Sequence, residues 1–333
     1  MKWGETKMKR LMGSLLTTLV AVGLLSFGLA PSAAESWPQK PIRMIVPFPP
    51  GGGTDFVGRL VAKYLSQRLG QTIFVENHGG ANGTVGLQAL MRSNPDGYTI
   101  AVTSDTPLTV NPLLYRNLPY QPLRDFILVA TVVRSPQLLA VHPSVPARSV
   151  AELIALAKAK PGGLSYGTGG IGNFAHLAME LFSLETGVKL LHVPYKGTGP
   201  AAMGLIGGEV QMAFIPVQTL LPYVKSGQLV AIAVAEPRRM PSLPDVPTVA
   251  ETLAGFEVAP WEGVIVPAGT PKEIVTRLRE ATLSIMRDPA IAEQFAIQQK
   301  TVMALGPDEF ADLVRKDSAR WEKVIKAANI QVQ

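Results

Sequence analysis

Several features are missing or scarce in this chain of 333 residues, and each absence excludes a class of site. There is no cysteine, so the chain can form neither a disulfide bond nor a zinc or iron–sulfur centre with thiolate ligands. The four histidines are dispersed. One of them, His176, has a carboxylate at helical spacing, Glu180, and this pattern is typical of two neighbours on one helix face. We therefore expect no metal site and no cofactor.

The chain also lacks a strong excess of charge of either sign. Its formal net charge is +6, and without residues 1–34, which carry four basic residues and one acidic residue, the charge falls to +3. No cluster of lysine and arginine with interleaved aromatic residues occurs, so nucleic acid is not expected as a partner. The small positive balance is compatible with an anionic ligand.

The first 34 residues match a signal peptide. A positively charged start is followed by an uncharged stretch at residues 11–34, which has its apolar centre at 15–30 and ends in the small residues Ser32-Ala33-Ala34. We predict cleavage after Ala34 and export from the cytoplasm, with Met8 as an alternative start. A retained membrane anchor is the competing interpretation because the stretch is just long enough to span a bilayer, but no positive stop signal follows it.

The rest of the chain alternates between apolar runs typical of buried strands and stretches with helical spacing. The runs at residues 42–46, 72–76 and 98–103 are separated by predicted helices, and the same order recurs from residue 164 onward. This alternation indicates βαβ units and therefore an α/β fold with mostly parallel sheets flanked by helices. Because the hydrophobic content of 47% supports two medium-sized cores, we predict two α/β lobes that face each other across a cleft.

The alternation breaks where two apolar runs, at residues 126–133 and 138–141, follow each other with no helix between them. We place the first crossing between the lobes there, and the return of the chain at the apolar run that begins at Phe256. The predicted organisation is a signal peptide at residues 1–34, a first lobe at residues 35–140 plus 257–333, and a second lobe at residues 141–256.

The segment from Pro47 to Asp55 joins a predicted strand to a predicted helix and contains three consecutive glycines. Glycines let backbone N–H groups approach a ligand closely, and the N-terminus of the following helix favours an anion. Thr54 and Asp55 are residue types that often cap helices. No Lys-Ser or Lys-Thr pair follows the glycines, which excludes a nucleotide P-loop. We predict a site for a small carboxylate here, although an ordinary strand-to-helix turn has the same local pattern.

Two other segments follow the ends of predicted strands. Ser104 and Asp105 follow the third strand, and Gly167–Asn173 is a second glycine-rich loop in the second lobe. In open α/β sheets, ligands bind at the carboxyl ends of the strands. We therefore expect the loop at residues 51–55 and the segment at residues 103–105 to share one edge of the first sheet.

Two motifs of enzymes fit only in part. Gly163–Gly167 matches the G-x-S-x-G elbow of serine hydrolases, but a second glycine run and not a helix follows the serine, and no acid and histidine come after it at suitable spacing. Gly167–Gly172 matches the dinucleotide pattern G-x-G-x-x-G, but the next strand ends at Pro194-Tyr195-Lys196 without the acidic residue that would bind a ribose. No complete catalytic set is present, so we predict a binding protein and not an enzyme.

A combination of short segments identifies a family. The segments are Trp37–Arg43, Val46–Asp55, Val75–Asn77, Asn94–Thr99, Asn111–Tyr115, Tyr166–Gly169, His176–Ala178, His192–Gly197, Gly207–Val210 and Leu243–Thr248. Together they resemble the periplasmic substrate-binding proteins of tripartite tricarboxylate transporters, often called the Bug family. The resemblance covers nearly all of the chain after the signal peptide.

The resemblance implies a two-lobe Venus-flytrap fold, the type II fold of periplasmic binding proteins, with the ligand between the lobes. It implies a small carboxylate ligand, held by backbone N–H groups and ordered waters, and delivery to a pair of membrane permease subunits. A flytrap of this kind is expected to act as a monomer. The ligand-binding residues that the resemblance implies are Phe48, Gly52, Gly53, Thr54, Asp55, Ser104, Thr168, Gly169, Asn173 and Pro216.

Two positions depart from the family pattern. His78 stands where arginine is usual, and Gln211 stands where aspartate is usual. The change at Gln211 alters the polarity of the strand leading to Pro216, so the chemistry of the distal half of the ligand is not determined. Dicarboxylates, tricarboxylates, aromatic acids and amino acids all fit such a site. Two other functions are kept as alternatives: a protein that presents its ligand to the outer domain of a membrane sensor kinase, and a periplasmic enzyme acting on carboxylic acids.

Overall fold

The computed structural model describes residues 37–331, and the chain from Lys40 onward forms one compact unit. The predicted signal peptide at residues 1–34 lies outside the described residues. Within the described part, no helix combines the length and the apolar character that crossing a bilayer requires.

The first lobe is built on a six-stranded sheet. In spatial order its strands are β11 (Thr301–Val302), β4 (Phe126–Arg134), β10 (Trp261–Pro267), β3 (Thr99–Ser104), β1 (Ile42–Val46) and β2 (Ile73–Asn77). Strand β1 pairs in parallel with β2 and β3, whereas β10 is antiparallel to β3 and β4, and β11 is antiparallel to β4. Every residue of β10 is buried, because this central strand has covered faces on both sides.

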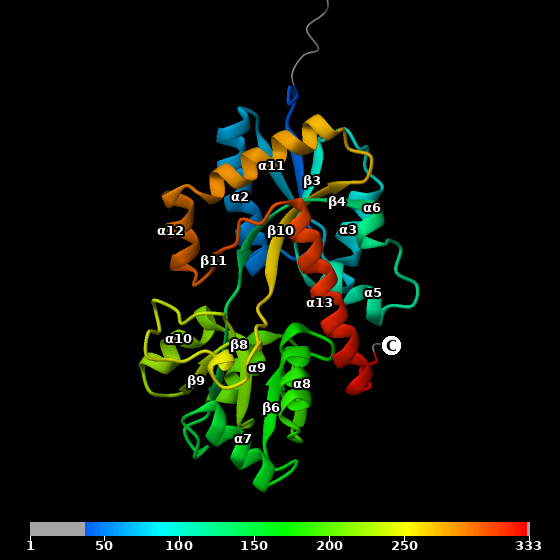
Figure 1. The fold of residues 1–333 in the computed structure, drawn as a ribbon. Coiled ribbons are helices and arrows are strands. Elements are labelled where there is room, and N and C mark those ends of the chain that lie inside the picture. Colours follow the sequence, from blue (N-terminus) through cyan, green and yellow to red (C-terminus); the bar gives the residue numbers. More distant parts are fainter. Residues whose placement is uncertain (1–36, 332–333) are drawn as a thin grey trace, which may run out of the picture. The chain divides into compact units, whose positions relative to one another are not determined.

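Helices pack on this sheet or on one another around it (Figure 1). They are α2 (Gly53–Leu69), α3 (Thr84–Met91), α4 (Thr106–Thr109), α5 (Asn111–Leu114), α6 (Pro122–Asp125), α11 (Lys272–Met286), α12 (Pro289–Ile297) and α13 (Pro307–Ala327), with a short 3₁₀ turn, η1 (Ala81–Gly83). Helix α2 buries Val57, Val61 and Leu65, which recur at helical spacing. It ends at Gly70 in the left-handed conformation, where glycine avoids a steric penalty.

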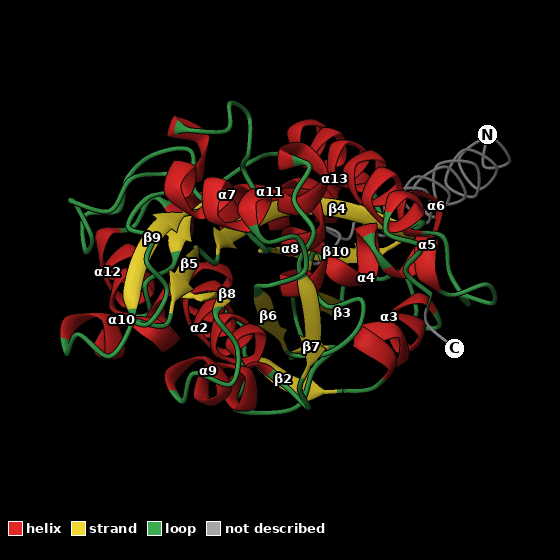
Figure 2. Ribbon diagram, turned by 90° about the horizontal axis from the view of Figure 1, so that it is seen from below, coloured by secondary structure: helices red, strands yellow, loops and turns green. Residues whose placement is uncertain are grey.

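The second lobe is built on a five-stranded sheet, again with helices around the strands (Figure 2). In spatial order its strands are β7 (Leu191–Pro194), β6 (Ser165–Thr168), β8 (Met212–Pro216), β5 (Gln137–Val141) and β9 (Val230–Val234). Its helices are α7 (Val150–Ala159), α8 (Phe174–Thr186), α9 (Thr198–Ile206) and α10 (Val217–Lys225), with a 3₁₀ turn, η2 (Val249–Glu251). Strand β6 is parallel to β7 and β8, and β5 is antiparallel to β8 and β9.

The predicted two-lobe α/β fold is confirmed, but the sheets are mixed and not mostly parallel. Strands β10 and β11 oppose the other strands of the first sheet, and β5 opposes the other strands of the second. A parallel neighbour requires a crossover connection through the same lobe. Strands β5 and β10 are each the first strand that the chain forms after it crosses from the other lobe. No crossover connection within the same lobe leads into them, so nothing forces them to pair in parallel.

Sheet membership moves one predicted boundary. The prediction placed the lobe boundary between residues 140 and 141, inside strand β5. In the structure β5 pairs along its whole length with β8 and β9 of the second sheet. The chain therefore crosses between the lobes at Ser135 and Pro136, before β5, and returns ahead of β10. An apolar run predicts a buried strand, but it does not reveal which sheet the strand joins.

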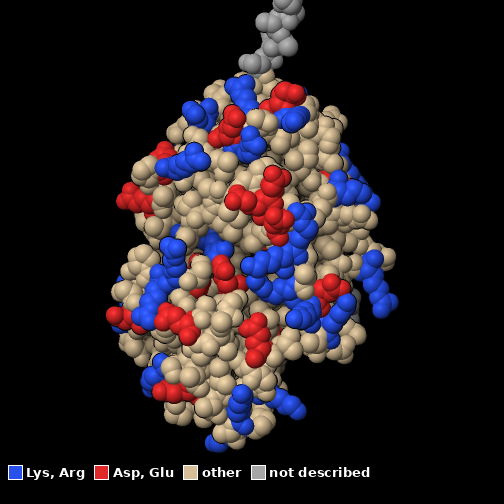
Figure 3. Space-filling view, viewed as in Figure 1, with Lys and Arg blue, Asp and Glu red and all other residues tan. Residues whose placement is uncertain are grey.

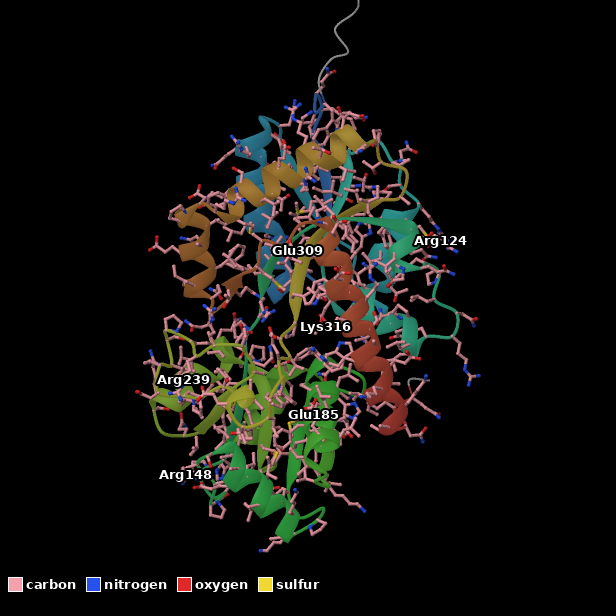
Figure 4. The ribbon with its side chains drawn as sticks, viewed as in Figure 1. Arg124, Arg148, Glu185, Arg239, Glu309 and Lys316 are labelled. Carbon is pink, nitrogen blue, oxygen red and sulfur yellow. The ribbon has the colours of Figure 1, made fainter. Side chains whose placement is uncertain are left out.

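Helix α13 was expected in the first lobe, yet it contacts both lobes. It packs on β4 and α4 of the first lobe and on α8 of the second. Near its end, Trp321 and Val324 are buried in one apolar core with Leu177 and Phe182 of α8. Figure 4 shows Lys316 on α13 above Glu185 on α8. Helices α11 and α12 contact strands of the first sheet, whereas the end of α13 also contacts the second lobe.

Candidate ligand-binding site

A cavity of about 310 Å³ is lined by residues of both lobes. The first lobe contributes the start of α2, the end of β3, the crossing at Ser135 and the turn before β11. The second lobe contributes the end of β8 and the starts of α8, α9 and α10. The volume suits a small molecule.

The register of the first sheet explains why these segments meet. Strand β10 pairs Glu262 with Ser104 of β3. Strand β11 runs beside the end of β4, so Lys300, just before β11, becomes a neighbour of Ser135, just after β4. Residues that are far apart in the sequence are thereby brought to one edge of the sheet.

The start of α2 gives this edge a preference for anions. Gly53 and Thr54, the first residues of the helix, line the cavity together with Ser104. The first N–H groups of a helix have no partner inside it, and Gly52 offers no side chain to cap them. These N–H groups also form the positive end of the helix dipole. The glycine loop and the end of the third strand therefore share one edge, as the sequence predicted.

Asp55, a predicted ligand contact, holds the glycine loop together and does not line the cavity. Its carboxylate accepts hydrogen bonds from Gly51 N–H (2.9 Å), Arg59 Nε (2.9 Å) and Asn77 Nδ2 (2.8 Å). Burial acts to raise the pKa of Asp55, but the hydrogen bonds from Arg59, Gly51 and Asn77 outweigh it and leave the pKa below its usual value. The side chain thus fixes the loop that presents the start of α2.

A buried ion pair forms another part of the cavity wall. Lys300 Nζ lies 3.2 Å from Glu262 Oε1 and donates to Ser135 Oγ (2.5 Å). The two charged side chains are only 6% and 5% exposed. The sequence analysis did not predict this group, because Lys300, Glu262 and Ser135 come together only through the pairing of their strands. A lysine that precedes a strand of two residues has no distinctive sequence pattern.

Asp105 follows β3 at the same edge and is 2% exposed. Burial raises the pKa of Asp105 to about 8, and the carboxylates of Asp317 and Glu262 contribute to the rise. Glu262 has Lys300 as a cationic partner and Asp317 has Arg320, whereas no such partner is found for Asp105 among the described residues. With its pKa raised to about 8, Asp105 is mostly protonated at neutral pH.

The second glycine loop, Gly167–Asn173, does not line the cavity. Thr168 is fully buried, and its hydroxyl is 2.7 Å from His192 Nε2. Asn173 caps α8, because its Oδ1 accepts a hydrogen bond from His176 N–H (2.9 Å). A Cβ on Gly169 would lie 2.9 Å from the backbone nitrogen of Thr198, so the absence of a side chain there serves close packing of the backbone.

Four of the ten predicted binding residues line the cavity, namely Gly53, Thr54, Ser104 and Pro216. The other six lie outside its wall, namely Phe48, Gly52, Asp55, Thr168, Gly169 and Asn173. The structure adds lining residues that were not predicted, among them Asp105, Ser135, Phe174, Thr198, Glu262 and Lys300. Direct contact of any of these residues with a ligand stays a prediction.

Gln211, one of the two departures from the family pattern, does not reach the cavity. Its Oε1 accepts hydrogen bonds from both the N–H and the hydroxyl of Ser165, each at 2.8 Å. This contact joins the start of β8 to β6. Gln211 thus changes the polar contacts at the start of the strand that leads to Pro216, where it bonds to Ser165 of the neighbouring strand.

His176 belongs to a stack of rings in the second lobe. Its ring lies 3.9 Å from that of His192, which in turn lies 4.9 Å from Tyr166. Burial, followed by the proximity of His192, lowers the pKa of His176 to about 4, so the ring is neutral at pH 7. Its Nδ1 accepts a hydrogen bond from Gly172 N–H (3.0 Å), and Glu180 accepts one from the Tyr166 hydroxyl. No group of three or more potential metal ligands gathers in residues 37–331.

Charges on the outer surface are mixed in sign. Figure 3 shows acidic and basic side chains next to each other over the face that α13 crosses. The acidic residues Asp308 and Glu309 lie in the first turn of α13, and Lys326 lies in its last turn, as the helix dipole favours. Acidic and basic groups therefore lie beside each other on this face.

Several known proteins are similar to this chain in sequence and in fold. Residues 57–330 match the family model described as the tripartite tricarboxylate transporter family receptor, TctC. Protein BugT of Bordetella pertussis is 35% identical over 321 residues, which cover 96% of this chain and 98% of BugT. An R. palustris protein solved with adipate is 35% identical, with 89% of this chain and 99% of that one covered and a TM-score of 0.76. MatC from Rhodopseudomonas palustris with bound malate is 30% identical, with 87% and 100% covered and a TM-score of 0.71.

These matches extend over both lobes and confirm the family that the short sequence segments identified. The family model alone covers residues 57–330, and BugT matches nearly from end to end. This chain belongs to the tripartite tricarboxylate transporter receptor family, whose members are periplasmic solute-binding proteins and not a family of enzymes.

Proposed function

We propose that this protein captures a small carboxylate in the cavity between its lobes and delivers it to the membrane permease subunits of a tripartite tricarboxylate transporter. The observation that carries the proposal is the uncapped N-terminus of α2, which lines the cavity at Gly53 and Thr54. Hydrogen bonds to a charged carboxylate contribute about 1.5–3 kcal/mol each. The similar proteins solved with adipate and with malate support a carboxylate as the ligand class.

In this proposal the binding residues fall into two groups. Gly53, Thr54, Ser104 and Pro216 contact the ligand directly because they line the cavity. The other predicted residues shape the two glycine loops, and these are Phe48, Gly52, Asp55, Thr168, Gly169 and Asn173. We further propose that the signal peptide at residues 1–34 is cleaved on export and that the protein acts as a monomer.

The proposal is tested by thermal unfolding of residues 35–333 in the presence of small carboxylates and of their amides. The series includes adipate, malate, aromatic acids and amino acids. A ligand at 100 times its Kd stabilises the folded state by about 2.7 kcal/mol. We expect at least one carboxylate to raise Tm while its amide does not.

Protein that has been unfolded, dialysed and refolded serves as the control, because this removes any ligand carried over from expression. If no carboxylate raises Tm of the refolded protein, carboxylate capture is wrong. Delivery is tested separately, by uptake of the same carboxylate into cells with and without the permease genes. Uptake that does not depend on the permease would contradict the transport role and leave the binding site intact.

The Gly53→Val variant is expected to lose ligand binding without losing stability. Among the described residues beyond its chain neighbours and its own helix backbone, a Cβ at position 53 would have Lys300 Nζ alone within 4 Å, at 3.8 Å, so the fold tolerates a side chain there. The two further methyl groups of valine enter the cavity in front of the first N–H groups of α2. Calorimetry should show Kd raised by at least about a hundredfold if two such hydrogen bonds are lost.

Gly53→Ala is the matched control because it adds the tolerated Cβ alone. It should bind several-fold more weakly than the wild type but much more tightly than Gly53→Val, and both variants should unfold within about 1 kcal/mol of the wild type. Normal binding by Gly53→Val would place the carboxylate elsewhere in the cavity.

A further inference from the structure

Lys300 is an unusual residue for the wall of a binding cavity. Its side chain is 6% exposed, and buried lysines are rare unless they are paired. An ammonium group has three N–H donors. Among the described residues, two donors are used by partners, Ser135 Oγ at 2.5 Å and Glu262 Oε1 at 3.2 Å. One donor is therefore left for a group in the cavity.

The ammonium lies directly at the start of α2. Its Nζ is 3.8 Å from the position that a Cβ of Gly53 would take, so the missing side chain of Gly53 leaves the two positive groups facing one space. The helix N-terminus and the ammonium repel each other across that space. A carboxylate between them would pair with both, and charge-assisted hydrogen bonds of this kind are the strong ones.

The fold holds Lys300 in place from three directions. Gln299 has a φ of 54°, a left-handed conformation that is uncommon outside glycine and that turns the chain from α12 into β11. Pairing of Thr301 with Arg134 then fixes Lys300 beside Ser135. Glu262 on β10 completes the contact from the neighbouring strand. This restraint reduces the entropy that the lysine would otherwise lose on binding a ligand.

We propose that Lys300 binds the ligand carboxylate directly, together with the N–H groups of α2, and that Glu262 and Ser135 are positioning residues for its ammonium. The inference rests on the proposed function and identifies the side chain that binds the negative charge of the ligand. Because Glu262 shares the same ammonium, it weakens the attraction of Lys300 for an anion. Loss of the Glu262 charge should therefore tighten carboxylate binding.

The test compares the wild type with Glu262→Gln and with the double variant Glu262→Gln, Lys300→Met. Lys300→Met alone is avoided because it would leave a buried and unpaired carboxylate, which is strongly destabilising. The probes are malate, adipate and, at high concentration, acetate, measured by calorimetry at pH 7. Glu262→Gln should bind more tightly than the wild type, and the double variant should bind roughly tenfold to a hundredfold more weakly than Glu262→Gln.

The matched control is Glu322→Gln with Lys326→Met, an exposed pair on α13 at 2.6 Å, with side chains 51% and 73% exposed. It makes the same chemical change and should leave Kd as it is. Equal affinities in Glu262→Gln and in the double variant would overturn the role of Lys300 and reduce it to a structural contact between strands, while the proposed function stands. A wild type that binds none of the probes would overturn both.

Discussion

The Asp105→Asn variant should be more stable than the wild type at pH 8, by up to about 5 kcal/mol. Asp105 lies between the end of β3 and the start of α4, where it is 2% exposed. Its carboxyl oxygen accepts a hydrogen bond from Thr106 Oγ1 at 3.3 Å, and the amide oxygen of asparagine can accept the same bond. The substitution therefore removes a titrating proton while it keeps the shape and the hydrogen bond.

The sign of the pH dependence follows from the two pKa values. Burial, then the carboxylates of Asp317 and Glu262, raise the pKa of Asp105 from about 3.8 to about 8 in the folded state. Between these values the folded protein holds a proton that the unfolded chain has released. The contribution of Asp105 to the free energy of unfolding of the wild type therefore falls as the pH rises from about 4, and this loss levels off above about pH 8. Asparagine does not titrate, so the difference in free energy of unfolding between the variant and the wild type grows by about 1.4 kcal/mol per pH unit in that range.

Urea unfolding at pH 5, 6.5 and 8 measures this difference in free energy of unfolding. Asp312→Asn is the control, because that carboxylate is 76% exposed and its replacement should change the free energy of unfolding by no more than about 0.5 kcal/mol at each pH. A difference between Asp105→Asn and the wild type that is the same at all three pH values would show that Asp105 is ionised in the folded state. A protonated Asp105 also matters for binding, because a neutral group at this edge does not repel an incoming carboxylate.

Local patterns in the sequence were sufficient for much of the fold. The apolar run before Pro47 and the periodic residues after Asp55 predicted β1 and α2, because burial on a covered strand and on one helix face leaves a direct mark on residue order. The glycines between them predicted a backbone-lined site for an anion. Gly53 and Thr54 do line the cavity, since the position of a helix N-terminus after a strand is a local property.

Contacts that depend on strand register could not be predicted in the same way. Lys300 meets Ser135 across 165 positions of sequence, and it does so only because β11 pairs with the end of β4. The second glycine loop shows a different limit of local patterns. Gly169 has the pattern of a ligand loop, but its free space is taken by the backbone of Thr198, and only the three-dimensional packing reveals this.

The Trp321→Ala variant should lose about 3–5 kcal/mol of stability, because it removes a large buried side chain from a core shared by the two lobes. Trp321 is 1% exposed, and its ring meets that of Phe174 edge to face with centroids 5.8 Å apart. Its Nε1 has no hydrogen-bond partner among the described residues. Trp321→Phe is thus the matched control: it keeps an aromatic ring, removes an unpaired N–H and should cost clearly less stability than Trp321→Ala, because it leaves a smaller cavity.

The same pair of variants tests how α13 supports the binding cavity. Phe174 lines the cavity at the start of α8, and Trp321 packs on it from α13. Trp321→Ala should therefore weaken ligand binding as well as stability, whereas Trp321→Phe should leave Kd close to that of the wild type. Urea unfolding and calorimetry measure the two effects on the same samples. If Trp321→Ala loses stability but keeps its Kd, α13 serves only to join the lobes. If it loses neither, the end of α13 does not pack on α8 in solution.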